Sequence, residues 1–468
     1  MLGKFKHIHF IGIGGIGMSS IASILLGRGF NISGSDLKPN RLTDDMSRRG
    51  AKIFFGHRPS NLLEEAELVV YSTSIDENNP ELIKARQKRL SVLHRSDIVA
   101  EMINIGAGVA VTGAHGKTTT AALSALLLTT AGLDPTVIVG GEAGFLGGNW
   151  RSGNSDYVVC EADESDGTFR KLRPRYAVLT NIDHEHLEHY ENFEDLIMAN
   201  KTFMENVKQE GCLITSHDDT NIKRLLRNYK RRFFTYGLLK NKSGLCAANI
   251  DMDGFHTSFE AIFKQKALGS FELNIPGRHN VANSLAVILL GLELGIDIGT
   301  IKDALSQYKG TLRRFELKGQ IDDIMIIEDY AHHPTEIMAT IASCKNWPGR
   351  RLVGIFQPHR YTRTKFLKKD FGKSFLGLDE LILTDIYSAS EKPIEGVTTK
   401  LIYDEAVKNG QRNIHLIKKE EILPRLLRTL RKEDIVLFLG AGDIGGLSNE
   451  LVKGLRAKSQ GAVQRAAV

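Results

Sequence analysis

The sequence predicts an α/β protein of three domains. Apolar runs with the length of buried strands alternate along the chain with helical patterns, which is typical of mostly parallel sheets covered by helices. Two glycine-rich turns each follow such a run and precede a helix, as loops that bind phosphate do. With 468 residues, the chain is too long for a single hydrophobic core.

The composition is that of an ordinary globular protein, with 42% hydrophobic residues, 25% charged residues and a net charge of +6. Both signs of charge are interspersed and no basic block occurs, so we expect no nucleic-acid partner. The sequence has no apolar run long enough to span a membrane and no secretion signal before the first strand. The cysteines are scattered, which is typical of a reducing compartment. We therefore expect a cytoplasmic protein without a membrane partner, either a monomer or a weak homodimer.

The first predicted domain, residues 1–105, has a Rossmann-like pattern. A strand over residues 7–11 leads into the glycine turn of residues 12–17, a helix follows, and the next strand ends at Asp36. The glycines allow the backbone to approach a pyrophosphate, and the acid can accept a hydrogen bond from a ribose. NAD and a nucleotide-diphosphate sugar fit this pattern equally well. The candidate ligand residues are Gly12, Gly14, Gly15, Gly17, Asp36, Ser72, His94 and Arg95.

The second predicted domain, residues 106–312, begins with a loop similar to that of P-loop ATPases. The match is incomplete, because Val111 stands where the usual motif has its first glycine. Backbone amides at the start of the following helix point at an anion, Lys117 offers a positive charge to the β- and γ-phosphates, and Thr118 offers a hydroxyl to Mg²⁺. The predicted ATP-binding residues of the loop are Gly113, Ala114, His115, Gly116, Lys117, Thr118 and Thr119.

Two polar clusters follow later strands of the same domain. Residues 161–166 are rich in acids, and residues 181–186 combine acids with histidines. A group of carboxylates beside phosphates is unfavourable unless a cation neutralises it. We therefore predict a Mg²⁺ site that includes Glu161 and Thr118. Magnesium prefers oxygen ligands, so the residues alone leave open whether His186 is a ligand or an ordinary loop histidine.

The third predicted domain, residues 313–456, repeats the alternation and is expected to form a second Rossmann-like sheet. Its strands are predicted at residues 324–328, 352–356, 380–384, 414–417 and 435–439. Polar groups follow three of these strands, at residues 329–334, 357–363 and 440–443, where parallel sheets bind ligands. Residues 457–468 are small and polar and are expected to form a flexible tail.

Along nearly its whole length the chain resembles the Mur ligase family. The resemblance lies in residues 12–18, 112–120, 161–166, 180–186, 277–283, 329–334 and 356–364. It implies an ATP-dependent ligase of peptidoglycan synthesis that uses Mg²⁺. A sugar carboxylate would attack the γ-phosphate of ATP, and an amine would then displace phosphate from the acyl phosphate. Within the family, the motifs are most similar to those of members that join L-alanine to UDP-N-acetylmuramate.

The resemblance also implies roles for individual residues. Lys117, His186 and His332 would be catalytic, and Thr118, Glu161 and His186 would hold the metal. The UDP-sugar would lie at the first glycine turn, and His279 and Asn283 would contact the adenine and ribose of ATP. The amino acid would lie at Tyr330, His359, Arg360 and Arg363. A guanidinium group pairs well with its carboxylate, but the sequence leaves open which arginine does so.

Several alternatives stay open. A related ligase that attaches a preformed tripeptide shares most of these motifs, although residues 357–363 favour a single amino acid. An NAD-dependent oxidoreductase would leave Lys117 and the acidic cluster unused, and a regulatory UDP-sugar-binding protein would not need the full set of ATP and metal residues. Either Arg313 or Arg314 could reach phosphates, or both could be solvated. Lys201 lies where several Mur ligases carry a carbamylated lysine, but we expect an ordinary exposed lysine here.

Overall fold

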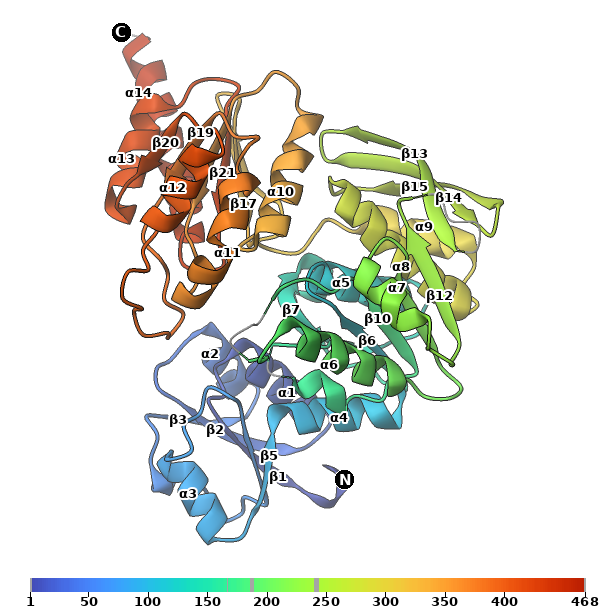
Figure 1. Ribbon diagram of the computed structural model, residues 1–468. Helices are drawn as coiled ribbons and strands as arrows, with labels where there is room; N and C mark the ends of the chain where they lie inside the picture. Colours follow the sequence, from blue (N-terminus) through green and yellow to red (C-terminus); the bar gives the residue numbers. More distant parts are fainter. Residues whose placement is uncertain (1, 166, 186–188, 240–243, 467–468) are drawn as a thin grey trace. The chain divides into compact units, whose positions relative to one another are not determined.

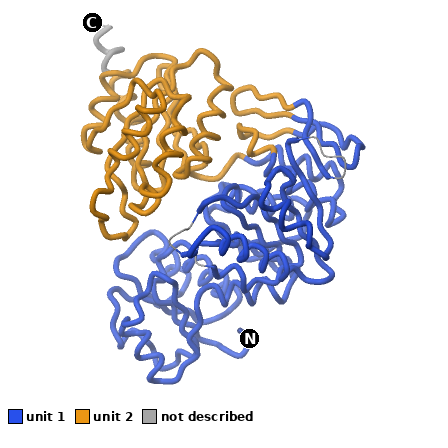
Figure 2. Tube along the Cα trace, viewed as in Figure 1, with its two compact units in different colours: residues 1–249, 259–271, 282–308 blue, residues 250–258, 272–281, 309–468 orange. Residues whose placement is uncertain are grey.

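Three sheets of five, ten and six strands carry the fold (Figure 1), which confirms the predicted three-domain α/β class. The computed structural model describes residues 2–165, 167–185, 189–239 and 244–466, with side chains up to Gln460. Contacts divide the chain into two compact units (Figure 2). Unit 1 comprises residues 1–249, 259–271 and 282–308, and unit 2 comprises residues 250–258, 272–281 and 309–468.

The first sheet is parallel throughout and has the order β3-β2-β1-β4-β5. Its strands are β1 (His7–Ile11), β2 (Asn31–Asp36), β3 (Lys52–Phe55), β4 (Leu68–Tyr71) and β5 (Ser91–His94). The helical elements are η1 (Leu2–Lys4), α1 (Ile16–Gly27), α2 (Arg41–Arg48), η2 (Pro59–Asn61), α3 (Pro80–Gln87) and α4 (Arg95–Ile105). Because β2 and β4 flank β1 on opposite sides, the strand order reverses at β1, and the carboxyl ends of β1 and β4 border the crevice where such sheets bind ligands.

The centre of the second sheet positions the predicted phosphate loop. β6 (Ala107–Thr112) lies between β9 (Tyr157–Glu161) and β10 (Tyr176–Leu179), and all three strands are parallel. The segments that follow these strands therefore meet at one edge of the sheet. The next helix, α5 (Lys117–Thr130), is buried from Thr118 to Leu128. Burial on all sides explains why residues 121–128 of this helix are almost continuously apolar rather than amphipathic.

The second sheet has the order β15-β14-β13-β12-β11-β10-β6-β9-β7-β8. Its remaining strands are β7 (Thr136–Ala143), β8 (Gly148–Arg151), β11 (Cys212–Ser216), β12 (Phe233–Gly237), β13 (Leu245–Asp253), β14 (His256–Phe263) and β15 (Lys266–Leu273). The other helical elements are η3 (Gly144–Leu146), η4 (Thr168–Lys171), α6 (Phe193–Glu205), α7 (Thr220–Leu226), α8 (Arg278–Glu293) and α9 (Ile298–Gln307).

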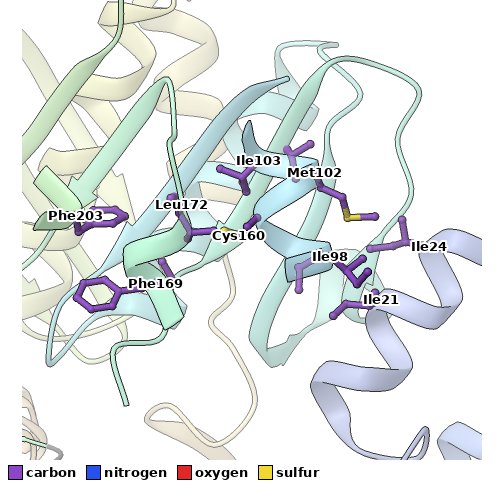
Figure 3. Packing of buried hydrophobic residues seen from close by; sticks show 14 of the residues in the cluster. Ile21, Ile24, Ile98, Met102, Ile103, Cys160, Phe169, Leu172 and Phe203 are labelled. Carbon is purple, nitrogen blue, oxygen red and sulfur yellow. The ribbon is translucent and has the colours of Figure 1, made fainter. Parts of the chain in front are cut away.

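The first two predicted domains share a hydrophobic core within unit 1. Figure 3 shows Ile21 and Ile24 of α1 and Ile98 and Met102 of α4 in the cluster that also contains Cys160 of β9. A buried hydrogen bond of 2.8 Å from Asn149 Nδ2 to Ser20 Oγ adds a polar contact between β8 and α1. The first sheet and the central sheet are consequently packed together in one compact unit.

The third sheet has the order β16-β17-β21-β18-β19-β20. An antiparallel edge strand, β16 (Glu316–Ile321), precedes the parallel strands β17 (Ile324–Asp329), β18 (Leu352–Phe356), β19 (Glu380–Leu383), β20 (Ile414–Leu416) and β21 (Ile435–Leu439). The helical elements are α10 (Pro334–Ser343), η5 (Cys344–Asn346), α11 (Tyr361–Ser374), α12 (Lys400–Lys408), α13 (Lys419–Thr429) and α14 (Gly445–Ala466). The segment expected to form a flexible tail continues α14 as far as Ala466.

Among the described residues, every helix is too short or too polar to cross a membrane.

Candidate active site

The loop after β6 needs its two glycines for geometric reasons. Gly113 and Gly116 have φ angles of +126° and +82°, a region that residues with a side chain rarely adopt. A Cβ atom at Gly113 would lie 2.3 Å from Thr180 Oγ1, and one at Gly116 would lie 2.5 Å from Asn283 Oδ1. Val111 is fully buried inside β6, so the position that carries the first glycine of the usual motif still belongs to the strand. The loop thus turns two residues later than the usual motif predicts.

The two residues that follow β10, Thr180 and Asn181, fix the conformation of this loop through hydrogen bonds. Asn181 Oδ1 accepts a 2.8 Å hydrogen bond from the amide of His115, and Asn181 Nδ2 donates to the His115 carbonyl at 2.9 Å. Thr180 Oγ1 donates to the same carbonyl at 2.6 Å. Side chains that follow a neighbouring strand therefore set the backbone conformation of the loop whose amides are predicted to bind phosphate.

The Lys117 ammonium group is partly buried between the loop and an acid. Its Nζ donates to the carbonyl oxygens of Gly113 at 2.7 Å and Ala114 at 3.1 Å, and to Glu164 Oε1 at 2.9 Å. Burial alone would lower the pKa of Lys117, but nearby carboxylates, with Glu164 contributing most, outweigh it and raise that pKa. Lys117 therefore carries a fixed positive charge at the loop.

Two of the predicted metal residues lie together. Thr118 Oγ1 donates to Glu161 Oε1 at 3.1 Å, and the amide of Gly140 donates to Glu161 Oε2 at 2.8 Å. Burial raises the pKa of Glu161, although the charge of Lys117 opposes this shift. A partly buried carboxylate beside a hydroxyl is a donor set that suits Mg²⁺, which binds oxygen and would offset the cost of removing the charge from water. The predicted metal ligand His186 lies outside the described residues.

The segment after β10 contributes one pair that the sequence did not predict. His115 Nε2 lies 2.9 Å from Asp183 Oδ2, so the loop histidine is held by an acid from the neighbouring strand end. The adjacency of β6 and β10 in the sheet could have pointed to this pair, but the sequence does not reveal that order.

Lys201 lies on α6, with its Nζ 3.8 Å from Glu205 Oε1, and its side chain is 43% exposed.

A pocket of about 540 Å³ lies at the carboxyl ends of the first sheet. Most of the predicted residues line it, namely Gly12, Gly14, Gly15, Gly17, Asp36, Ser72 and Arg95. His94 is outside this lining, and its Nε2 lies 3.3 Å from Thr73 Oγ1, which does line the pocket. The sequence did not predict the apolar side chains of Ile16 and Leu37 at the pocket, which are 58% and 69% exposed, nor His57.

Asp36 stabilises the backbone at this pocket by accepting hydrogen bonds from two amides. Its Oδ2 accepts a 2.8 Å hydrogen bond from the amide of Gly14, and its Oδ1 accepts a 2.7 Å bond from the amide of Leu37. A Cβ atom at Gly14 would lie 2.9 Å from that same Oδ2, so a side chain here would require Asp36 to shift. Asp36 thus braces the glycine turn, and its contact with a ribose stays a prediction.

In unit 2, four aromatic rings follow one another along the strand ends. The ring centroids of Tyr330 and His332 are 5.5 Å apart, those of His332 and His359 are 5.7 Å apart, and those of His359 and Tyr387 are 5.7 Å apart. Arg363 Nη1 donates to the carbonyl of His359 at 3.2 Å. The sequence predicted all of these residues except Tyr387. The structure therefore brings the candidate amino-acid residues together within one unit.

Two arginines that precede β16 differ in their surroundings. The guanidinium of Arg313 donates to Glu328 Oε1 at 2.8 Å and to the carbonyls of Gly440 and Gly442, which gives it a structural role. Arg314 Nη1 lies 3.7 Å from Glu336 Oε1, and the guanidinium groups of Arg313 and Arg314 both face the ring of Tyr330. Neither arginine is simply solvated.

Other predicted residues lie at helix starts or strand ends. Arg360 precedes α11 with a φ angle of +72°, which is unusual for a residue with a side chain and is often found at functional sites. Asp329 is buried at the end of β17, and burial raises its pKa to about 6. His279 lies in the first turn of α8, and Asn283 further along the same helix is the residue that faces Gly116.

Comparisons with known proteins place the chain among ligases. Sequence profiles described as the Mur ligase family catalytic domain, the Mur ligase middle domain and the Mur ligase glutamate ligase domain match residues 7–105, 111–291 and 313–442. The chain is 43% identical over 454 residues to the UDP-N-acetylmuramate–L-alanine ligase of Pelotomaculum thermopropionicum, covering 97% of this chain and 98% of that protein.

Solved structures agree with these sequence matches. The UDP-N-acetylmuramate–alanine ligase of Thermotoga maritima superposes with a TM-score of 0.80 and 30% identity, covering 97% of this chain and 99% of that one. A murein peptide ligase of Psychrobacter arcticus has the same fold, with a TM-score of 0.69 and 23% identity over 96% of this chain and 98% of that one. By its sequence profiles, its full-length relatives and its fold, the chain belongs to the Mur ligase family.

Proposed function

We propose that the protein is an ATP-dependent ligase that joins L-alanine to the carboxylate of UDP-N-acetylmuramate in peptidoglycan synthesis, releasing ADP and phosphate. The observation that carries this proposal is the 43% identity over 97% of the chain to a UDP-N-acetylmuramate–L-alanine ligase. The loop that carries Lys117 and the pocket at the first glycine turn support it, because the reaction needs sites for ATP and for a nucleotide sugar.

The chemistry begins with activation of a carboxylate. A carboxylate is a poor acyl donor until one of its oxygens becomes part of a good leaving group, so the sugar carboxylate attacks the γ-phosphate of ATP and forms an acyl phosphate. Lys117 holds a positive charge at the loop and would stabilise the phosphoryl oxygens as their charge develops. The loop amides, positioned by Thr180 and Asn181, would bind the phosphates that stay on ADP.

Magnesium, when bound, would neutralise charge on the transferred phosphoryl group. Thr118 and Glu161 would hold it, and we retain His186 as a further proposed ligand. Glu161 can serve this purpose because Gly140 and Thr118 already orient its carboxylate. The relatives support the use of ATP, and the donor set supports the use of Mg²⁺.

The second half of the reaction needs an uncharged amine beside the acyl phosphate. The amine attacks the acyl carbon, a tetrahedral intermediate forms, and phosphate leaves. Arg360 or Arg363 would hold the carboxylate of the amino acid, with His359 and Tyr330 beside it. His332 would lie close to the reacting groups.

The substrates can be tested directly. Purified protein with ATP, Mg²⁺, UDP-N-acetylmuramate and one amino acid at a time is expected to release ADP and to form a product whose mass equals the UDP-sugar plus L-alanine minus water. A product formed only with a tripeptide would overturn the choice of L-alanine. A change in NADH absorbance without ADP release would favour an oxidoreductase.

Nucleotide preference gives a second test. The pocket of the first sheet is expected to bind UDP-N-acetylmuramate and not NADH, because its glycines suit any pyrophosphate and selectivity must come from the uracil and sugar contacts. Separate calorimetric titrations with the two ligands measure this preference. Tight NADH binding would contradict the assignment of the pocket.

Substitution of the two candidate arginines tests the amino-acid site. Arg360→Lys or Arg363→Lys is expected to raise the KM for L-alanine by about tenfold, because lysine cannot pair with a carboxylate through two parallel hydrogen bonds. The KM for ATP should change little. Arg412→Lys, at an exposed position of the same unit, is the matched control. An unchanged KM for L-alanine in both variants would move the amino-acid site elsewhere.

The proposed substrates are small molecules, and we propose that the enzyme works in the cytoplasm as a monomer or weak homodimer. The four cysteines are buried and free, as expected in a reducing compartment.

A further inference from the structure

A cluster of buried polar side chains lies beneath the pocket of the first sheet. The Glu81 cluster consists of His7, His9, Ser33, Ser35, His57, Asn61 and Glu81, contributed by β1, β2, α3 and the segment between β3 and α3. Glu81, His9, Ser33 and Ser35 have no exposed surface. Burying a carboxylate and several imidazoles costs free energy that an apolar core would avoid, so the cluster calls for an explanation.

Glu81 is the centre of the cluster and accepts hydrogen bonds on both oxygens. Ser35 Oγ donates to Oε2 at 2.7 Å, and His9 Nε2 lies 2.9 Å from the same oxygen. Asn61 Nδ2 and the amide of Arg58 donate to Oε1 at 2.8 and 3.1 Å. Burial would raise the pKa of Glu81, but these hydrogen bonds, with that from His9 the largest, outweigh it and lower that pKa. The carboxylate is therefore ionised and acts only as an acceptor.

The hydrogen-bond partners of His57 determine which of its ring nitrogens carries the proton. The single hydroxyl proton of Ser35 goes to Glu81, because an ionised carboxylate cannot donate. Ser35 Oγ must then accept from His57 Nδ1, which lies 3.0 Å away, and the same Nδ1 lies 3.4 Å from Glu81 Oε1. His57 thus carries its proton on Nδ1. In the neutral ring, Nε2 is then a hydrogen-bond acceptor.

His57 connects the cluster with the ligand pocket. It is the cluster member that lines the pocket of about 540 Å³, together with the glycine turn and Ser72. Its side chain is 15% exposed, whereas that of Glu81 is fully buried. A substitution of Glu81 can therefore affect a bound ligand only through the residues that are hydrogen-bonded to Glu81, such as His57.

We propose that Glu81 is a positioning residue for the nucleotide sugar, which keeps the proton of His57 on Nδ1 so that Nε2 accepts a hydrogen bond from the uridine part of the ligand. The donor would be the imide N–H of uracil or a ribose hydroxyl. This inference rests on the proposed function, which assigns the UDP-sugar to this pocket. Glu81 itself would touch no substrate.

Two substitutions of His57 separate ligand contact from a purely structural role. Asparagine places an amide nitrogen near the position of Nδ1 and so keeps the contact with Ser35, but it has no atom near Nε2. Glutamine places its amide near Nε2 and can accept from the ligand. Calorimetric titration with UDP is expected to give about tenfold weaker binding for His57→Asn, the loss typical of one hydrogen bond, and largely recovered binding for His57→Gln. A structural role alone would produce the opposite order and would overturn the proposal.

The role of Glu81 is tested by binding and by spectroscopy. Glu81→Gln is expected to weaken UDP binding by about tenfold and to raise the KM for the UDP-sugar while the KM for ATP stays unchanged. Glu64→Gln, an exposed carboxylate of the same domain, should behave like the wild type. Nitrogen-15 NMR of histidine-labelled wild-type protein should show His57 protonated on Nδ1, and Glu81→Gln should reduce that form.

Each outcome decides the proposal. A wild-type His57 protonated on Nε2 would overturn it, as would unchanged UDP binding in His57→Asn. If Glu81→Gln fails to fold, the His57 pair and the wild-type spectrum still decide. If the wild type does not bind UDP, the assignment of the UDP-sugar to this pocket is wrong. If the wild type binds UDP but these variants bind it equally well, only the proposed role of Glu81 and His57 is wrong. Titration with 2′-deoxy, 3′-deoxy and N3-methyl analogues of UDP identifies the donor.

Discussion

Lys117→Ala is expected to abolish turnover of ATP while the protein stays folded. Lys117 is the cation that the structure places against the loop carbonyls and Glu164, where charge develops on the transferred phosphoryl group in the proposed reaction. Removing one such contact typically costs about 3 kcal/mol or more of transition-state stabilisation, or at least about a hundredfold in rate. ADP release in the presence of all substrates measures this loss.

A second variant separates chemistry from stability. Lys117→Ala removes the cation that lies 2.9 Å from Glu164, so the buried acids lose part of their compensation. The double variant Lys117→Ala with Glu164→Gln is expected to regain thermal stability without regaining ADP release. Lys230→Ala, at an exposed position of unit 1, serves as the control. Near wild-type ADP release from Lys117→Ala would remove the loop from the ATP site.

Glu161→Ala is expected to increase steeply the Mg²⁺ concentration needed for half-maximal ADP release, without changing which amino acid is used. Thr118 and Gly140 hold the carboxylate of Glu161, which we propose as a metal ligand. Loss of a carboxylate ligand weakens metal binding by about a hundredfold or more, since even partners of ligands contribute 10–100-fold. A Mg²⁺ titration of ADP release measures the effect. Glu210→Gln, an exposed acid of the same unit, is the control.

The pH dependence of this requirement has a definite sign. Burial raises the pKa of Glu161, and only the ionised carboxylate binds a cation. As the pH falls through this raised pKa, the wild type should need more Mg²⁺, whereas Glu161→Gln should lose this part of the pH dependence. High activity of Glu161→Ala with no response to added Mg²⁺ would make the acidic cluster a structural feature.

Local sequence patterns determined the elements that carry the loops. The strands at residues 7–11, 352–356 and 435–439 occur in the structure with the predicted bounds, because short apolar runs between turn residues have few alternatives to a buried strand. The glycines at 113 and 116 likewise follow from local geometry, since both have positive φ angles. A loop with its strand and helix is continuous in sequence, so one stretch of the chain is enough to identify it.

Other strands could not be predicted from such runs. Much of β13, β14 and β15 is exposed or half-buried and contains many polar side chains, and β3 has no fully buried residue. β16 is an antiparallel edge strand without an apolar run, and no strand was predicted there. These segments are strands because neighbouring strands pair with them, which is a property of the sheet and not of their own composition.

Tertiary structure alone decided how the site residues are used. Four contacts show this: Asp36 accepts a hydrogen bond from the amide of Gly14, and three further side-chain pairs form, namely His115 with Asp183, Arg313 with Glu328 and His57 with Glu81. The sequence separations in these pairs range from 15 to 68 residues, so no local pattern contains both partners. The sequence by itself determined the family, the loops and most candidate residues, because each is written in a continuous stretch. Which side chains bind substrate and which only hold their neighbours depends on strand order and on burial, and these arise only when the sheets assemble.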